Sequence, residues 1–452
     1  MNNPHWSSRT VFLLAAIGSA VGLGNIWKFP YIVGENGGGA FVLVYLLCIA
    51  LVGIPVLIAE LLIGKTAQAN PISAFENLSR QFRASRFWVL FGYMGVITGF
   101  LILSFYSVVA GWSLEYLSVF LQNDLLNSDA KAVEQYFGNL LANPLQLLLW
   151  HSVFMLLTIA IVSRGVKKGI EKLISLVMPM LFVILAILVI YAIQQPGASQ
   201  AFDYLFTPDF SKINTEAVLT ALGHAFFTLS LGMGAMMVYG SYLDKGTPVV
   251  RLSLSIALVD TLVALLAGLA IFPLIFTHGL DPSSGPSLLF ISLPNALLAL
   301  PFGQFFGVFF FFLLLIAALS SAISILEPVV HAIEQKMTLK RNLSTWFVGS
   351  IIWLIGIAAL LAFNDWSDIK IIGDKNIFDS LDYLTANILL PLGGFGISLF
   401  AAWVLATKSS IKASLGIGGA AYHAWFLLAA TIAPLIIAVI ALREIFPEWM
   451  PF

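Results

Sequence analysis

The chain has 452 residues, of which 60% are hydrophobic and only 10% are charged. Its mean hydropathy is +0.96. Soluble domains carry roughly 25% charged residues, so this composition excludes a soluble globular protein. The formal net charge of −1 argues against a nucleic-acid partner. The single cysteine, Cys48, excludes a disulfide framework and a cysteine metal cluster.

Apolar stretches of about 20 residues recur along the whole chain, which predicts an all-α integral membrane protein. We expect one transmembrane transporter domain over residues 1–452, with eleven transmembrane helices. The expected spans are residues 9–34, 38–64, 86–122, 145–163, 167–193, 218–243, 250–277, 302–335, 344–363, 380–406 and 422–443. The connection 278–301 is apolar and contains four prolines, so we expect short helices there that dip back toward the protein.

The lysines and arginines alternate between loops in the way that sets membrane orientation, since cytoplasmic loops carry the excess of positive residues. Sixteen lie in segments that we assign to the cytoplasm: Arg9, Lys65, Arg80, Arg83, Arg86, Arg164, Lys167, Lys168, Lys172, Lys245, Arg251, Lys336, Lys340, Arg341, Lys408 and Lys412. Five lie in segments assigned to the outside: Lys131, Lys212, Lys370, Lys375 and Arg443. We therefore expect a multi-pass protein of the cell inner (plasma) membrane with a cytoplasmic N-terminus. The odd number of spans then places the C-terminus outside.

Residues 19–30, SAVGLGNIWKFP, interrupt the first apolar run with Gly22, Gly24, Asn25 and Pro30. Glycine costs about 1 kcal/mol relative to alanine in a helix interior. An unsatisfied peptide group in hydrocarbon costs several kcal/mol more, so non-helical backbone survives there only inside the protein or along a wet cavity. The alternative is that these small residues form a tight helix-packing surface.

The sixth span, AFFTLSLGMGAMMVYGSY, carries Ser230, Gly232 and Gly234 near its middle. It lies five spans after the first, so the two breaks occupy matching positions in two five-helix halves. Such a pair of broken helices indicates a transporter binding site at the membrane midplane. Because five is odd, the halves would have inverted topology, with repeat one at 9–193, repeat two at 218–406 and an additional helix at 422–443.

Five motifs spread over nearly the whole chain are GSAVGLGNIWKFPY, ENGGGAFVLVYLL, GIPVLIAELLIG, FFTLSLGMGA and LLIAALSSAISILEP. Through them the sequence resembles the neurotransmitter:sodium symporter family, in particular its bacterial amino-acid transporters of the LeuT/MhsT type. The resemblance implies the LeuT fold, with two inverted five-helix repeats and discontinuous helices 1 and 6. It also implies sodium-coupled import of amino acids or related amines.

Two sodium sites follow from the resemblance. One uses the Ala20 carbonyl, the Asn25 side chain, Thr228 and Asp260, and the other uses the carbonyls of Gly18, Val21 and Ala317 with the hydroxyls of Ser320 and Ser321. The physics fits, because unwound backbone from Gly18 to Gly22 would free carbonyl oxygens for a hard cation, while half-helix N-termini attract a carboxylate. Taken alone, the two serines would more often pack or bond to a helix carbonyl.

The expected substrate-binding residues are Ser19, Ala20, Gly22, Gly24, Ile102, Tyr106, Phe227, Thr228, Ser230, Met233, Ser321 and Ile325. Tyr106 resembles the family tyrosine that donates a hydrogen bond to the substrate carboxylate, although a buried tyrosine alone would more often be core. Monoamine carriers of the family have an aspartate at the position of Gly22. Glycine leaves room for a substrate that brings its own carboxylate, which favours a neutral, hydrophobic or aromatic L-amino acid.

Asp260 is an intramembrane acid, and such residues are functional candidates by default. The family positions that bind chloride in animal members read Tyr45, His224, Thr228 and Ala264 here. We therefore expect Asp260 to supply the fixed negative charge and transport to be independent of chloride. His224 could be a proton site or a hydrogen-bonded core histidine, and we favour the core interpretation.

Further residues match family support and gating positions. Glu60 is expected to cap backbone amides at the break of the sixth span, and Glu327 resembles a network residue on the cytoplasmic side. Lys28 and Asp382 match the outer gating pair, although Asp382 could also be an ordinary loop end. Lysine replaces the more usual arginine, so we expect a less directional bridge.

The inner gate departs from the family pattern, because Asn3 and Gln335 stand where an arginine and an aspartate usually pair. Inner closure is therefore expected to depend on Trp6, on Tyr242 or on another pair. In the fifth span, Gly169 and Pro179 match residues that unwind the helix in related carriers, with a harmless kink as the alternative.

The sequence thus predicts a sodium-coupled symporter that imports a neutral L-amino acid by alternating access. Its expected partners are the substrate, two sodium ions and the lipid bilayer, and it is not expected to be an enzyme. The weak inner-gate chemistry leaves a non-transporting amino-acid sensor as an alternative. An intramembrane hydrolase using Ser320 or Ser321 with His224 or His331 is disfavoured, since no acid orients either histidine. The motifs fix neither the oligomeric state nor the particular amino acid.

Overall fold

The fold is described by a computed structural model that covers residues 6–125, 128–244, 246–408 and 415–445. Asn3, Lys245 and Lys412, which enter the predictions above, lie outside the described residues. The regular elements within these ranges are helices, apart from one isolated bridge between Ile372 and Lys375. The expected all-α architecture is therefore confirmed.

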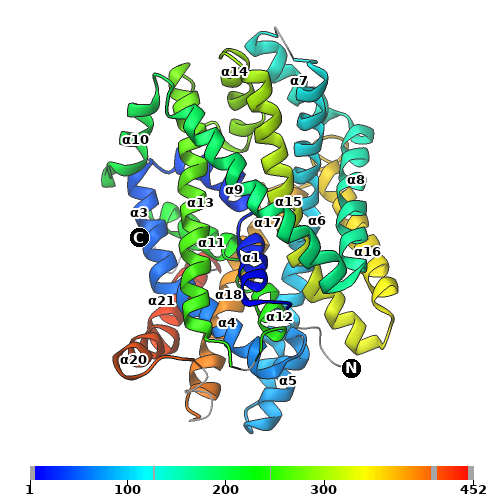
Figure 1. The fold of residues 1–452 in the computed structure, drawn as a ribbon, viewed down its shortest axis with the longest axis vertical. Coiled ribbons are helices and arrows are strands. Elements are labelled where there is room, and N and C mark those ends of the chain that lie inside the picture. The colour runs from blue at the N-terminus through cyan, green and yellow to red at the C-terminus, as the bar shows by residue number, and fades with distance from the viewer. Residues whose placement is uncertain (1–5, 126–127, 245, 409–414, 446–452) are drawn as a thin grey trace.

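The helices follow the chain as labelled in Figure 1. The first half contains α1 (Arg9–Ala20), η1 (Gly24–Lys28), α2 (Phe29–Glu35), α3 (Gly39–Cys48), η2 (Ile49–Gly53), α4 (Ile54–Ala67), α5 (Pro71–Gln81), η3 (Arg86–Trp88), α6 (Val89–Gln122), α7 (Ala130–Ala142), α8 (Pro144–Ser163), η4 (Val166–Glu171) and α9 (Lys172–Ala192). The second half contains α10 (Ala198–Phe206), η5 (Phe210–Lys212), α11 (Thr215–Thr228), α12 (Ala235–Ser241), α13 (Val249–Thr277), η6 (Gly285–Leu289), α14 (Ser292–Leu298), α15 (Gly303–Met337), α16 (Arg341–Leu361), α17 (Ile377–Tyr383), η7 (Leu384–Leu389), α18 (Leu390–Leu399), η8 (Phe400–Leu405), α20 (Gly419–Leu427), η9 (Leu428–Ile432) and α21 (Ala433–Ile445).

Nine helical segments among the described residues are long and apolar enough to cross a membrane. They are Gly39–Ala67, Arg86–Gln122, Pro144–Ser163, Val166–Ala192, Val249–Thr277, Gly303–Met337, Arg341–Leu361, Ile377–Leu405 and Gly419–Arg443. A tenth span is the pair Arg9–Ala20 and Gly24–Glu35, bent by 46°. The remaining expected span consists of α11 and α12, separated by residues 229–234. The observed limits differ from the predicted ones by at most three residues.

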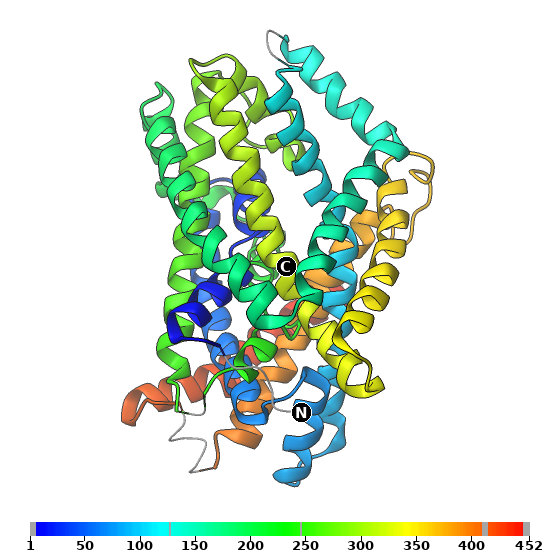
Figure 2. The ribbon, with the colours of Figure 1, turned by 45° about the vertical axis from the view of Figure 1, so that its right-hand side comes forward.

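Short helices cover the two ends of the bundle. α7, α10 and α14 lie at one end and α5 lies at the other, as Figures 1 and 2 both show. The apolar connection 278–301 forms η6 and α14, as its sequence predicted. The connections that contain α7, α10 and α14 therefore lie opposite the connection that contains α5, in agreement with the loop assignment.

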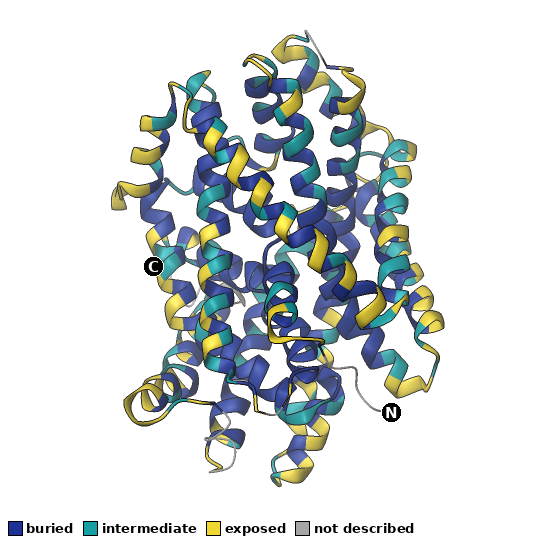
Figure 3. Ribbon diagram, viewed as in Figure 1, coloured by how far each residue is buried: buried dark blue, intermediate teal, exposed yellow. Residues whose placement is uncertain are grey.

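The two broken spans lie inside the bundle. Their residues are buried along most of their length, as the dark blue interior ribbons of Figure 3 indicate. Large apolar side chains such as Leu149, Leu176 and Ile190 are instead exposed on outer helices. Lipid-facing helices are expected to expose such side chains, because the surrounding hydrocarbon is as apolar as leucine.

The first break is shorter than the sequence suggested. Gly18, Ser19 and Ala20 remain helical, and only Val21 and Gly22 leave the helix. The expected unwinding from Gly18 to Gly22 is therefore wrong in its extent. Asn25 explains the sharp limit, because its Oδ1 accepts a hydrogen bond from the Gly22 amide at 3.1 Å and closes the turn locally.

The second break depends on left-handed backbone. Gly232 and Gly234 have φ of 78° and 77°, values that glycine adopts without a steric penalty. Ser230 also has a positive φ of 53°, which is uncommon for a residue with a side chain. Its hydroxyl donates to the Ser19 carbonyl at 2.7 Å, so the second break is tied directly to the first.

Candidate functional site

A very small cavity of about 10 Å³ lies where the two breaks meet. It is lined by Ser19, Ala20, Gly22, Leu23, Gly24, Tyr106, Phe227, Ser230, Met233, Ser321 and Ile325. All of these except Leu23 were expected from the sequence. This volume is about what one water molecule needs and is far below the roughly 300–1,000 Å³ of ligand pockets, so the helices around the cavity must move apart to admit a substrate.

Two expected lining residues do not border the cavity. Ile102 is fully buried within α6. The Thr228 hydroxyl lies 3.3 Å from the Tyr45 hydroxyl, and it also donates to the Ala225 carbonyl at 3.5 Å. Leu23 was missed because an apolar residue at a helix restart gives no sequence signal.

Polar groups converge on one side of the cavity. The Tyr106 hydroxyl accepts from the Leu23 amide at 3.3 Å and donates to the Ala318 carbonyl at 3.3 Å. The Ser19 hydroxyl donates to the Ser324 hydroxyl at 2.7 Å. The Leu23 amide belongs to the restart of the first span, where a helix N-terminus favours negative charge. A carboxylate at this place would meet both an amide and a phenol.

Two members of the first expected sodium set, Asp260 and Asn25, contact each other. The Asn25 side-chain amide donates to Asp260 Oδ1 at 2.7 Å and to the Asp260 carbonyl at 3.0 Å. Asp260 Oδ2 is buried and has no hydrogen-bond partner among the described residues. A buried charged group without a partner is strongly unfavourable. A cation beside Oδ2 would remove that penalty.

The second expected set brings α1 and α15 together. The Ser321 hydroxyl lies 3.4 Å from the Gly18 carbonyl oxygen, 3.2 Å from that of Ser19 and 3.3 Å from that of Val21. The Ser320 hydroxyl donates to the Ala317 carbonyl at 3.0 Å. One hydroxyl carries a single proton and cannot satisfy three carbonyls at once. The surplus lone pairs suit a hard cation with oxygen ligands.

Lys28 and Asp382, the expected gating pair, contact each other next to the cavity. Lys28 Nζ lies 2.7 Å from each carboxylate oxygen of Asp382. The same ammonium lies 5.1 Å from the centre of the Phe227 ring, which lines the cavity. The lysine therefore contacts both oxygens of its partner and stacks on an aromatic face. These contacts connect the first span with α11 and α17.

A second ion pair, which the sequence did not reveal, joins α15 and α16. Arg341 at the start of α16 donates to both carboxylate oxygens of Glu327 in α15. The Tyr242 hydroxyl donates to Glu327 Oε1 at 2.7 Å. Trp6 packs edge-on against Tyr242 and donates its indole N–H to the Tyr239 carbonyl at 3.2 Å.

Gln335 takes no part in an ion pair. It bonds to the Asn70 side chain, and its Nε2 lies 2.8 Å from His331 Nε2. At the position of Gln335 the family ion pair is therefore absent, as predicted. An ion pair forms elsewhere, between Glu327 and Arg341. Arg341 was missed because it begins the span after Glu327 and belongs to no motif.

The side chain of Glu60 has a hydrogen-bond partner, whereas the side chain of His224 has none among the described residues. Glu60 Oε1 accepts from the Gly232 amide at 2.5 Å, inside the second break. His224 packs against Phe29 and Tyr45, with ring centres 5.9 and 5.3 Å away. Neither of its nitrogens has a hydrogen-bond partner among the described residues. His224 is therefore buried, as expected for a core histidine, but the expected hydrogen bond is absent among the described residues.

The fifth span is helical throughout in this structure. Gly169 lies in the π-helical turn η4, and a Cβ there would stand 2.1 Å from the Ile161 carbonyl oxygen. Pro179 lies inside the continuous helix α9. The sulfur atom of the adjacent residue Met178 lies 2.8 Å from the position that a Cβ on Gly18 would occupy. The predicted unwinding is absent from this conformation, and the span packs against the second sodium set.

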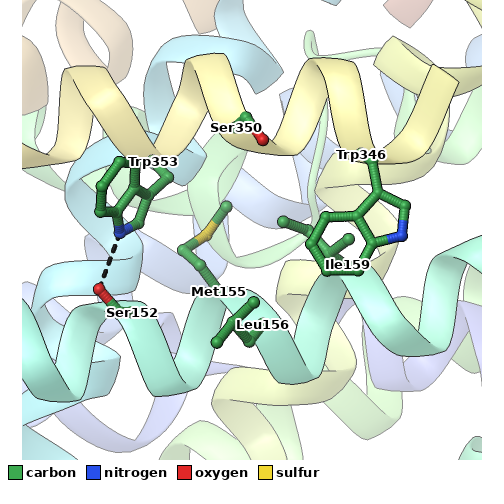
Figure 4. Close-up of a pocket in the computed structure, with 7 residues that line it drawn as sticks. All are labelled: Ser152, Met155, Leu156, Ile159, Trp346, Ser350 and Trp353. Carbon is green, nitrogen blue, oxygen red and sulfur yellow. Dashed lines mark hydrogen bonds between the residues drawn. The ribbon is translucent and has the colours of Figure 1, made fainter. Parts of the chain in front are cut away.

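A separate groove lies between α8 and α16 (Figure 4). Ser152 and Met155 line it on one helix, and Trp346, Ser350 and Trp353 line it on the other. The Trp353 indole donates to the Ser152 hydroxyl at 2.9 Å. No charged residue lines this groove, and it is remote from the helix breaks. We therefore do not assign the substrate to it.

Comparisons with known proteins agree with this geometry. A family model described as the sodium:neurotransmitter symporter family matches residues 3–136 and 129–447. An uncharacterized sodium-dependent transporter of Bacillus subtilis (strain 168) is 40% identical over 444 residues, with 97% of each chain covered. An uncharacterized sodium-dependent transporter of Haemophilus influenzae is 36% identical over 448 residues, with 98% of each chain covered. The crystal structure of MhsT in complex with L-phenylalanine superposes with a TM-score of 0.92 and 44% identity, over 98% of this chain and 99% of that chain.

A helical bundle in which two broken helices enclose a buried site is typical of secondary transporters. The chain belongs to the sodium:neurotransmitter symporter family. Its fold is the LeuT fold, as the superposition on MhsT shows. The family consists of transporters, so the expectations of a sodium-dependent membrane transporter and of no enzymatic activity are confirmed.

Proposed function

We propose that this protein imports a neutral, hydrophobic or aromatic L-amino acid together with sodium. The observation that carries this proposal is the cavity at the two helix breaks, where Gly22, the Leu23 amide and the Tyr106 hydroxyl lie together. These groups suit a carboxylate. Phe227, Met233 and Ile325 form an apolar wall that suits an apolar side chain. The neighbouring structure of MhsT holds L-phenylalanine.

Gly22 selects for the carboxylate that the substrate brings. A Cβ built on Gly22 would stand 2.2 Å from Ser321 Oγ and 3.1 Å from the Tyr106 hydroxyl. Any side chain at this position would therefore collide with Ser321 of the second sodium set. Only glycine lets the first break pack this closely against α15 and leaves its backbone accessible to the substrate carboxylate.

Two sodium ions are proposed as co-substrates. Asp260 Oδ2, with Asn25, Thr228 and the Ala20 carbonyl, would hold one, and the carbonyls and hydroxyls around Ser321 would hold the other. Moving one unit charge through the membrane field yields about 2.3 kcal/mol per 100 mV. Two sodium ions moving with a zwitterion would gain roughly twice that free energy, in addition to their concentration gradient.

Transport is proposed to be independent of chloride. Asp260 supplies a fixed carboxylate at the first set. The positions that match the chloride site contain a Tyr45–Thr228 contact and the apolar Ala264. Equal uptake when gluconate replaces chloride is expected, and strict dependence on chloride would refute this part of the proposal.

Alternating access would start from the closed state described here. The Lys28–Asp382 pair closes the outer path, and the Glu327–Arg341 pair with Trp6 closes the inner one. Opening to either side must break one of these sets, and sodium and substrate must favour different states than the empty carrier does. A non-transporting amino-acid sensor stays the alternative, and sodium-driven uptake in vesicles distinguishes the two.

The membrane position follows from the same proposal. The lysine and arginine bias supports a cytoplasmic N-terminus in the inner (plasma) membrane and a C-terminus outside. Labelling of single cysteines introduced at Lys131 in the α7 end and at Lys167 in the opposite loop would test it. We expect an impermeant reagent to reach the first from outside intact cells and the second only after permeabilisation.

Competition for uptake tests the function itself. Membrane vesicles containing the protein should take up labelled L-phenylalanine when a sodium gradient is present, and unlabelled apolar amino acids should compete most strongly among the twenty. Choline in place of sodium should abolish uptake. Sodium-independent uptake, or competition by charged amino acids alone, would overturn the proposal.

A further inference from the structure

An open polar groove lies at the end of the bundle that carries α5. It contains about 970 Å³ of space, part of it open to solvent, between the end of α5, the start of α6 and the end of α15. Four of its lining side chains are cations, namely Arg80, Arg83, Arg86 and Lys336, and Glu76 is the one acid among its lining residues. The lining therefore carries a net charge of +3, although the chain as a whole carries −1.

The backbone gathers the three arginines around one opening. Arg83 adopts a left-handed conformation with φ of 55°, and the Ala84 amide donates to the Ser79 carbonyl at 2.8 Å. This turn ends α5 and sends the chain into η3 within a few residues. Arg80, Arg83 and Arg86 therefore line the same groove from a single tight connection.

These cations are poorly neutralised within the protein. Lys336 reaches Glu76 at 3.5 Å, but both side chains are about half exposed, and such surface pairs contribute little. Among the described residues, Arg80 donates only to the neutral Asn77 amide oxygen, at 3.3 Å. The groove thus presents positive charge outward.

Ser79 adds an unsatisfied donor to the same groove. Its side chain is 2% exposed, and its hydroxyl has no hydrogen-bond partner among the described residues. A buried hydroxyl without a partner is unfavourable. An acceptor oxygen that enters between the arginines would satisfy it.

The surroundings of the groove are apolar on the membrane side. Phe87, Leu90 and Ile97 in η3 and α6 are 62%, 54% and 52% exposed, and they lead away from the groove along the membrane span. Tyr93 lines the groove and lies under the Lys336 ammonium at 5.9 Å. A ligand that matches this face has an anionic head and long apolar chains.

We propose that this groove binds the phosphodiester headgroup of an anionic phospholipid. The headgroup oxygens accept from the arginines and from Ser79, and the acyl chains lie along the exposed apolar side of α6. Clustered basic residues next to a membrane span recognise such headgroups. On the orientation proposed above, the lipid belongs to the cytoplasmic leaflet. Because Lys336 ends the helix that carries Ser320 and Ser321, the bound lipid connects α5 and α6 to the helix of the second sodium set.

Native mass spectrometry of the full-length protein tests this proposal by counting retained lipids. Phosphatidylglycerol is titrated as the ligand, phosphatidylcholine serves as the zwitterionic lipid, and inorganic phosphate serves as the free anion. Each cation near the bilayer surface contributes about a fivefold factor in affinity, so the variant Arg80→Gln/Arg83→Gln/Arg86→Gln should bind phosphatidylglycerol roughly 100-fold more weakly. The matched control Arg164→Gln/Lys167→Gln/Lys168→Gln loses the same charge in another loop at the same end and should retain the lipid.

Three results would overturn the proposal. One is equal weakening by the two triple variants, and another is equal retention of phosphatidylcholine and phosphatidylglycerol. The third is displacement of the lipid by an equal concentration of inorganic phosphate, which would indicate a simple anion site. If the arginine variant does not fold, Lys336→Gln and Ser79→Ala decide the matter, since each should weaken binding a few-fold and an unchanged affinity would refute the assignment. Sodium-driven uptake reports separately on transport, so failure of the proposed function leaves this binding test intact.

Discussion

Replacement of Asp260 by asparagine removes one buried negative charge while it keeps an oxygen ligand and nearly the same shape. Asp260 Oδ1 already accepts from the Asn25 amide at 2.7 Å, whereas Oδ2 has no partner among the described residues. A sodium ion about 4 Å from a unit charge gains about 4 kcal/mol at an effective dielectric constant of 20. Because about 1.4 kcal/mol corresponds to a tenfold change, Asp260→Asn should raise the half-saturating sodium concentration by up to nearly a thousandfold.

The assay is uptake of labelled L-phenylalanine into vesicles at increasing sodium concentration, with the ionic strength kept constant by choline. Asp365→Asn is the matched control, because it removes the same charge from an exposed loop where water and salt screen it. The control should leave the sodium dependence unchanged. A half-saturating sodium concentration for Asp260→Asn within twofold of the parent would refute the electrostatic role assigned to this carboxylate.

Three further substitutions test other parts of the site. Gly22→Ala should weaken substrate binding at least tenfold in an equilibrium binding assay, because the new Cβ would stand 2.2 Å from Ser321 Oγ. The control Gly138→Ala should leave binding unchanged, because a Cβ there meets nothing within 4 Å. Lys28→Gln should speed dissociation of bound substrate to the outer side a few-fold, since a partly exposed ion pair contributes up to about 1 kcal/mol, and Lys28→Arg should restore slow release; equal off-rates in all three proteins would count against the outer gate. Pro179→Ala should slow net uptake but leave the sodium dependence of substrate binding intact. Proline lacks a backbone N–H, and the missing hydrogen bond makes the fifth span easier to open. Unchanged net uptake would support a harmless kink.

The spans were predictable because each is long and apolar, and hydropathy is a strong signal over about 20 residues. Their limits were also close, since loops carry the charged residues. The extent of the first break was not predictable in the same way. Whether Gly18 stays helical depends on Asn25, whose side chain captures the Gly22 amide and ends the break early. That contact is a local capping hydrogen bond over three residues, which hydropathy and periodicity do not record.

The residues of the inner gate could not be predicted from the sequence either. Family spacing directed attention to Asn3 and Gln335, but the charged pair forms between Glu327 and Arg341 on consecutive spans. Glu327 stands within a motif, whereas Arg341 is one of several cations in its loop. The sequence gives no reason to prefer it over Lys340, because the choice depends on how α15 and α16 cross. The cavity lining was predicted from the family resemblance, because the glycines and serines that mark the two breaks do not by themselves indicate Tyr106, Phe227 or Met233.

Equilibrium binding of labelled L-phenylalanine to the purified protein, in sodium chloride and in choline chloride, tests the central claim most directly. If carbonyl oxygens around Ser321 and the free oxygen of Asp260 hold sodium beside the substrate carboxylate, binding should be strong in sodium and absent in choline. Equal binding in the two salts would contradict the account, because the helix breaks would then hold the substrate without a cation.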